Sequence, residues 1–182
     1  MTVKWLYYWQ PSIGVTMSSQ TLSIAIKRIE ALHGVKTSRW QITASQFRPN
    51  QREPVPLVEC ARELLGVVFS EVPDKYYFAL RQEHMVVEAD ATMQAIMEKL
   101  QVYRNRLTIL FEVDYKPLSS VEQSRRVVQD FMEVWQKGET TGQFVPLDPN
   151  FSEFNLPDLY SWQHTALQYV TLMAFVFSQQ RT

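Results

Sequence analysis

The N-terminal residues have a hydrophobic period of two. Within residues 2–9, "TVKWLYYW", every second position carries a bulky apolar side chain. These positions are Val3, Trp5, Tyr7 and Trp9. The pattern predicts a β-strand with one aromatic face, which Pro11 ends.

The period becomes helical after residue 18. The apolar positions at helical spacing are Leu22, Ala25, Ile26, Ile29 and Leu32. Ser18 or Ser19 can cap the first turn, and Gly34 stands where a left-handed residue would close the helix. A second strand is then predicted from about Trp40 to Phe47.

Short apolar runs between turn signals predict four more strands. They cover residues 64–70, 76–80, 85–89 and 107–115, with "EVPDK" and "RQEH" as turns. Asp90 can cap a helix whose apolar face holds Met93, Ile96, Met97, Leu100 and Tyr103.

Two further helices are predicted in the C-terminal third. Ser120 and Gln123 form a capping box for the first of them, which ends at Lys137-Gly138. We expect this helix to bury Val121, Val128, Phe131 and Trp135. The second starts near Pro157 and has an apolar stripe of Leu159, Trp162, Tyr169, Val170, Met173 and Phe177.

The order of these elements indicates an α+β fold with a mainly antiparallel β-sheet flanked by four helices. A length of 182 residues favours a single domain, 1–182. Residues 48–56 are proline-rich and predict a surface loop, and residues 138–157 predict a crossing over the surface.

Composition narrows the classes of function. The net charge is −1, without the basic excess or basic stripe of a nucleic-acid-binding module. The single cysteine, Cys60, excludes an internal disulfide framework and fits a reducing compartment. No secretory signal is evident at the N-terminus, and the most apolar segment, residues 166–177, is too short to span a membrane. We therefore expect a soluble intracellular protein.

A histidine lies among carboxylates in the segment from Phe78 to Leu100. Glu83, His84 and Glu88 lie in or beside a predicted hairpin, and Asp90 has a capping role. No second histidine or cysteine pair stands at metal-binding spacing. The segment is interpreted as a hairpin that leads into a helix, with no metal or cofactor.

One strand offers an alternative, enzymatic interpretation. "FEVDYK" places Glu112, Asp114 and Lys116 on one face. This resembles the ExExK strand of triphosphate tunnel enzymes, in which carboxylates hold a divalent cation on a polyphosphate. The match departs because an aspartate replaces the middle glutamate and no other strand has an alternating charged face. A divergent tunnel-type phosphohydrolase remains the alternative to a solvated strand face.

The serial order of several segments carries a second resemblance. "VKWLYYW", "SSQTL", "RIEALHG" and "SRWQITASQFR" lead into the strongest block, residues 67–103, with "SEVP", "FAL", "AD" and "KL" in register. "FEVDYKP" and "ALQYVTLM" follow later in the chain. Together they resemble the Mediator complex subunit 20 (TRF-proximal protein) family. Members of that family carry a strand pair where only Arg104 to Ile109 stand here.

The resemblance implies a partial β-barrel with flanking helices and a non-enzymatic subunit of the nuclear Mediator head module. It implies a heterodimer with Mediator subunit 18, tethered by subunit 8. Contacts with TATA-binding protein and RNA polymerase II are also implied. No cofactor, direct nucleic-acid contact or membrane contact is expected.

Two aromatic faces are candidates for the partner interface. Trp5, Tyr7 and Trp9 are more large rings than a small sheet usually buries on one strand. The last helix is apolar around most of its girth, so it must be covered on two sides. Its candidates are Trp162, Tyr169, Met173 and Phe175. For both faces, full burial in the chain's own core is the competing explanation.

Overall fold

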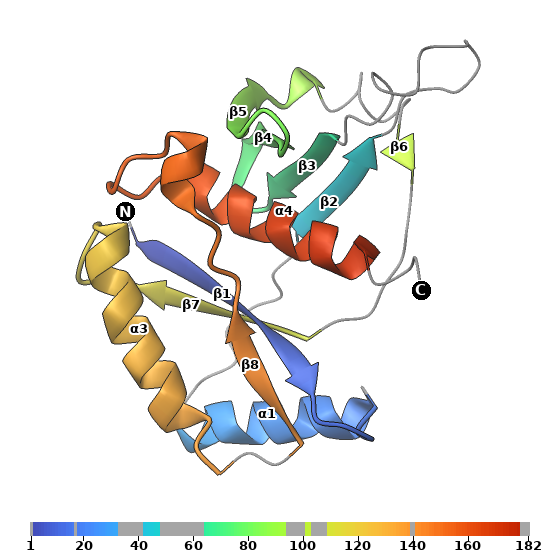
Figure 1. Ribbon diagram of the computed structural model, residues 1–182, viewed down its shortest axis with the longest axis vertical. Helices are drawn as coiled ribbons and strands as arrows, with labels where there is room; N and C mark the ends of the chain where they lie inside the picture. Colours follow the sequence, from blue (N-terminus) through green and yellow to red (C-terminus); the bar gives the residue numbers. More distant parts are fainter. Residues whose placement is uncertain are drawn as a thin grey trace.

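The aromatic N-terminal strand is the centre of a three-stranded antiparallel sheet (Figure 1). Strand β1 (Val3–Pro11) pairs with β7 (Leu110–Tyr115) on one side and with β8 (Gly142–Pro146) on the other. The computed structural model describes residues 2–16, 18–32, 42–47, 64–93, 101–102, 109–138 and 141–178.

A second antiparallel sheet has the order β5-β4-β3-β2-β6. Its strands are β2 (Ile42–Phe47), β3 (Leu64–Phe69), β4 (Val72–Leu80), β5 (Met85–Asp90) and β6 (Gln101–Val102). Two tight turns join the middle strands, at residues 70–71 and 81–84. His84 closes the second turn in the left-handed region, with φ of 48°.

Helix α4 (Trp162–Ser178) lies between the two sheets and packs against strands of both (Figure 1). Helix α3 (Val121–Trp135) covers the other face of the three-stranded sheet, and α1 (Ser19–Ala31) lies near its far end. A short 3-10 helix, η2 (Phe151–Phe154), precedes α4. None of the described helices is long and apolar enough to cross a membrane.

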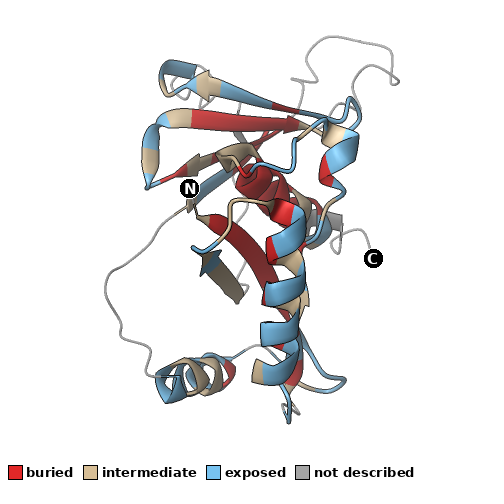
Figure 2. Cartoon of the chain, turned by 90° about the vertical axis from the view of Figure 1, so that its left-hand side faces the viewer, coloured by how far each residue is buried: buried red, intermediate tan, exposed pale blue. Residues whose placement is uncertain are grey.

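The two faces of β1 explain why this strand is buried along most of its length (Figure 2). Its odd-numbered residues face α3, where Trp5 Nε1 donates to Ser124 Oγ at 3.1 Å. Its even-numbered residues face α4, which hydrogen-bonds to the β1 backbone through Gln168. A strand covered by a helix on each side lies in the core of the molecule.

The α+β class with antiparallel sheets is confirmed, but the described strands form two open sheets and not one partial barrel. Three α-helices are fully described, against the four expected. Of the helix expected after Asp90, only residues 92–93 are described and helical. The loop expected at 48–56, Gly34 and Arg104 lie outside the described residues.

Several boundaries differ from the predictions. Strand β4 begins at Val72, because a two-residue turn replaces the longer "EVPDK" turn. Gln101 and Val102 pair with β2, so the preceding helix cannot run to Tyr103 as expected. The last helix starts at Trp162 and not near Pro157.

The segment expected to cross the surface at 138–157 instead contributes to the core. It contains β8 and η2, and its buried side chains are Phe144, Leu147 and Phe151. On α3 the predicted cap is confirmed, since Ser120 Oγ accepts from the Gln123 amide at 3.2 Å. Phe131 is exposed, however, and Met132 is buried in its place.

Candidate functional site

A buried lysine joins the two sheets. Lys4, on β1, is 4% exposed, and its Nζ lies 2.7 Å from Glu112 and 3.2 Å from Asp114 on the neighbouring strand β7. It also lies 3.0 Å from Glu71, in the turn between β3 and β4. One cation therefore links the three-stranded sheet to the five-stranded sheet.

Helix α4 completes this Lys4 cluster. The Tyr169 hydroxyl donates to Glu112 Oε2 at 2.9 Å, and the Trp162 ring lies 5.3 Å from Lys4 Nζ. A desolvated cation close to an aromatic face is favoured by the ring's quadrupole. The cluster thus holds β1, β7, α4 and the β3–β4 turn in one arrangement.

Burial and the neighbouring charges shift the pKa values of Lys4 and Glu112 in opposite directions. Burial alone would lower the pKa of Lys4, but the hydrogen bond and charge of Glu112, together with Glu71 and Asp114, raise it well above its ordinary value. Burial raises the pKa of Glu112, against the influence of Lys4 and Tyr169. Lys4 is therefore a permanent cation whose role is to bind these carboxylates.

This geometry bears on the tunnel-enzyme hypothesis. Glu112 and Asp114 do lie on one face of β7, but Lys4 occupies the space between them and Tyr169 holds Glu112 from α4. Lys116 follows β7 and is exposed. In the described part of the chain, no three His, Cys, Asp or Glu side chains gather as metal ligands would. The arrangement fits a structural ion-pair cluster and does not favour phosphohydrolysis.

Gln168 extends the three-stranded sheet with a side chain. Its Oε1 accepts from the Leu6 amide at 2.8 Å, and its Nε2 donates to the Lys4 carbonyl at 2.9 Å. Strand β8 does not reach this part of β1, where the last backbone bond runs from the Leu147 amide to the Leu6 carbonyl at 2.8 Å. The Gln168 amide therefore takes the place of a further strand residue.

The aromatic residues of β1 lie in the core. Trp5, Tyr7 and Trp9 are all buried by the chain itself. Trp5 packs against Phe151 with ring centroids 6.0 Å apart. The segment expected to cross the surface thus covers part of this aromatic face.

The candidates on α4 divide by their exposure. Tyr169 and Met173 are buried between the sheets. Trp162 is half-buried and packs on Phe69 with centroids 5.0 Å apart. Phe175 is 38% exposed, and its ring packs beside that of Tyr8 with centroids 5.0 Å apart. Trp162 and Phe175 are therefore the predicted interface residues that keep accessible area.

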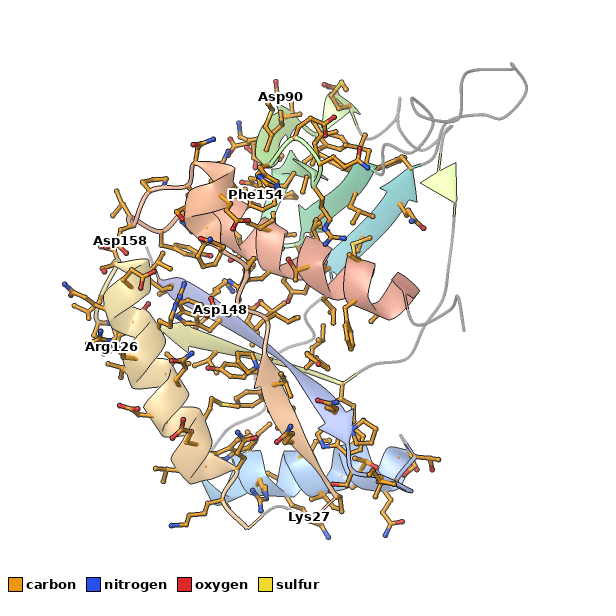
Figure 3. The ribbon with its side chains drawn as sticks, in the orientation of Figure 1. Lys27, Asp90, Arg126, Asp148, Phe154 and Asp158 are labelled. Carbon is orange, nitrogen blue, oxygen red and sulfur yellow. The ribbon has the colours of Figure 1, made fainter. Side chains whose placement is uncertain are left out.

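The histidine hairpin is a structural turn with a paired strand. The rings of His84 and Phe154 lie with their centroids 5.4 Å apart. Lys75 on β4 forms ion pairs with Glu88 at 3.1 Å and with Asp90 at 3.7 Å. Figure 3 shows Asp90 at one end of the molecule, far from the acidic residues beside α3. Asp90 is therefore not part of a common site with Asp148 and Asp158.

A second histidine, His164, locks the start of α4. Its Nε2 donates to the Pro157 carbonyl at 2.9 Å, and its Nδ1 accepts from the Ser161 amide at 3.1 Å. Nearby, Asp158 accepts from Ser120 Oγ at 2.7 Å and from the Glu122 amide at 2.8 Å. The loop before α4 thus caps α3 as well (Figure 3).

Sequence reasoning missed Lys4, Glu71 and Gln168. Their partners lie as many as 164 positions away along the chain, so no local pattern identifies them. Two signals were present: a lysine within an otherwise aromatic strand, and the Gln168-Tyr169 pair in the segment "ALQYVTLM".

Comparison with known proteins bears on the whole chain. It matches the family described as "TATA-binding related factor (TRF) of subunit 20 of Mediator complex" over residues 1–109 and 108–174. An Arabidopsis thaliana relative, "Mediator of RNA polymerase II transcription subunit 20b", is 36% identical over 208 positions, which cover 96% of this chain and 95% of the relative. The resemblance drawn from the sequence is confirmed, and the chain belongs to the Mediator complex subunit 20 family.

Proposed function

We propose that this protein is a structural subunit of the Mediator head module. It acts in transcription by RNA polymerase II through protein contacts and not through catalysis. The observation that carries the proposal is the family match over nearly the whole chain. Membership in a nuclear transcription complex also implies that the protein works in the nucleus.

The surface supports a role in protein contacts. Apolar side chains with 40% or more of their area exposed lie on the outer sides of two helices: Leu22 and Ile26 on α1, and Val127, Phe131 and Val134 on α3. Contiguous exposed apolar residues are typical of protein–protein interfaces. The Lys4 cluster, by contrast, lies inside the molecule and links its strands to one another. Its geometry gives no support to the tunnel-enzyme alternative.

The proposed partner is Mediator subunit 18, with subunit 8 as the tether to the head module and contacts to TATA-binding protein and RNA polymerase II beyond it. The proposed contact residues are those predicted from the sequence, led by Phe175 and Trp162, which keep accessible area. The other residues predicted from the sequence are buried and would hold the contact residues in position from the core: Trp5, Tyr7, Trp9, Tyr169 and Met173.

Co-expression with Mediator subunit 18 tests the proposal, with size-exclusion chromatography and light scattering as the readout. We expect a stable 1:1 complex. Phe175→Asp should weaken the complex at least about tenfold, as truncation of a central aromatic residue does, while near-UV circular dichroism stays unchanged. Phe131→Asp is the comparison variant, because Phe131 on α3 is 40% exposed and Phe175 is 38% exposed, and the proposal expects the larger loss of binding from Phe175→Asp.

Each outcome has a definite meaning. A well-behaved monomer that ignores subunit 18 would refute the partner. A complex weakened by Phe131→Asp and not by Phe175→Asp would move the interface from α4 to α3. Loss of folding in Phe175→Asp would assign that ring to the core.

A further inference from the structure

In the described part of the chain, the backbone of β7 is paired with β1 on one side and has no strand on the other side. The Trp9 amide donates to the Ile109 carbonyl at 3.0 Å, which makes this a hydrogen-bonded pair. In an antiparallel ladder such pairs alternate with pairs whose N–H and C=O groups point away from the partner. Given the register, the outward-pointing residues of β7 are Leu110, Glu112 and Asp114.

The opposite edge of the same sheet is protected at Phe144 and Pro146. On β8 the outward Phe144 amide donates to Gln136 Oε1 at 2.9 Å, and Pro146 has no amide N–H. Prolines and side-chain caps are common means of protecting an edge strand from pairing. Among the described residues, no comparable group binds the outward amides of β7.

The comparisons place a family difference beside this edge. The family match falls into two parts that meet at residues 108–109, immediately before β7. The alignment with the Arabidopsis relative spans 208 positions, although this chain has 182 residues. The longer alignment shows that the relative has residues that this chain lacks, and the break in the family match falls immediately before β7.

The two faces of the β7 edge differ in chemistry. Leu110, Glu112 and Asp114 lie on the α4 side, and Phe111 and Val113 lie on the α3 side. On the α4 side, the charge of Lys4 neutralises one of the three carboxylates of the Lys4 cluster, Glu71, Glu112 and Asp114. The side chains of Asp114 and Glu71 are 44% and 40% exposed. Counting exposed Lys116, the cluster keeps one net negative charge. The other face offers half-buried apolar side chains.

We propose that the outer edge of β7 is a strand-addition site for an extended segment of a partner protein. The segment has basic residues opposite Glu112 and Asp114 and apolar residues opposite Phe111 and Val113. Main-chain hydrogen bonds supply the pairing, and the alternating side chains supply the selectivity. A second copy of β7 fits less well, because the acidic positions of the two strands would meet. The site is independent of which surface meets Mediator subunit 18.

Amide hydrogen exchange, followed by NMR on the full chain, tests the open edge directly. In the free protein the Glu112 and Asp114 amides should exchange at least about tenfold faster than those of Phe111 and Val113, because only the latter pair with β1. Equal protection along β7 would overturn the proposal, since the edge would then be covered.

Binding is tested with a blocked five-residue probe peptide in which two lysines alternate with two valines, followed by leucine. It should slow exchange at Glu112 and Asp114. A peptide with glutamates in place of the lysines should bind about tenfold more weakly, since two favourable cross-strand pairs become like-charge pairs. Equal binding of both peptides would refute the charge selectivity. Slowed exchange at these amides with rising protein concentration alone would make a second copy the occupant.

Two variants of Asp114 distinguish the contribution of its backbone amide to probe binding from that of its carboxylate charge. Asp114→Pro removes an outward amide while leaving the ladder to β1 intact, as prolines do in edge strands, and should abolish probe binding. Asp114→Asn keeps the amide and should weaken binding of the lysine probe about threefold. Asp130→Asn, at an exposed position of α3, should leave binding unchanged. If Asp114→Pro fails to fold, the exchange pattern of the wild type still decides the question.

Discussion

Gln168→Leu tests whether a side chain can stand in for a missing strand. Leucine has a similar volume but neither donates nor accepts a hydrogen bond. The Leu6 amide and the Lys4 carbonyl would lose the partners that Gln168 holds at 2.8 and 2.9 Å. Because Gln168 is 1% exposed, water cannot replace those partners.

The size of the effect follows from these two groups. An unsatisfied buried polar group costs about 1–3 kcal/mol, so the two together cost about 2–6 kcal/mol. Added apolar burial by leucine offsets about 1–2 kcal/mol of this. We expect a net loss of about 3 kcal/mol in the free energy of unfolding. For a chain of this length that lowers Tm by about 6–12 °C.

The matched control is Gln136→Leu, the same substitution at the edge of β8. Gln136 also accepts from a backbone amide, that of Phe144, but the bond is only partly buried. Water can take its place, so the loss should stay below about 1 kcal/mol. Reversible urea unfolding of both variants supplies the comparison. If Gln168→Leu costs no more than Gln136→Leu, the idea of a buried strand substitute is wrong.

Three further predictions concern the core. Gly66→Ala would place its Cβ 2.5 Å from a ring carbon of Tyr76, so we expect a loss of about 1–3 kcal/mol from overpacking, and a stability equal to wild type in urea unfolding would contradict it. Burial lowers the pKa of His164, so the unfolded chain takes up a proton that the folded chain excludes. The unfolding free energy should therefore fall as pH drops from 7.5 to 5.5, by at most about 1.4 kcal/mol per pH unit, and His164→Gln should remove this slope. Lys4→Met leaves the carboxylate of Glu112 buried without its cation and should cost about 3–5 kcal/mol. Adding Glu112→Gln should recover part of that loss in thermal unfolding, and no recovery would show that the charge pair is not the cause.

The sequence predicted elements whose cause is local. The period of two around Trp5 identified β1, and Ser120 identified the start of α3, because a strand face and a helix cap each depend on a few neighbouring residues. It missed β8, where a glycine and a proline flank Phe144 and leave no alternating run. Burial of that segment comes from β1, more than 130 residues earlier in the chain.

In the candidate interface, too, local features could be predicted from the sequence and features that depend on distant contacts could not. An aromatic face was visible in the sequence, but whether it is core or surface depends on what packs against it. Phe151, in the segment expected to cross the surface, packs on Trp5 and helps to make that face core. Met132 and Phe131 are neighbours on α3, and a small rotation of the helix decided which of them is buried. Local patterns give a face, and distant contacts decide its role.

Helix α4 shows why a helix between two sheets needs buried polar residues. Apolar contacts on both sides would allow the helix to slide or rotate at small cost, because apolar packing is not directional. Gln168 and Tyr169 are directional, since one binds the backbone of β1 and the other binds Glu112 on β7. Lys4 then extends this constraint to Glu71, in the turn that joins β3 and β4 of the second sheet. Desolvating these groups costs stability, so their contribution is to fix one arrangement of the two sheets around α4, on which any surface offered to a partner depends.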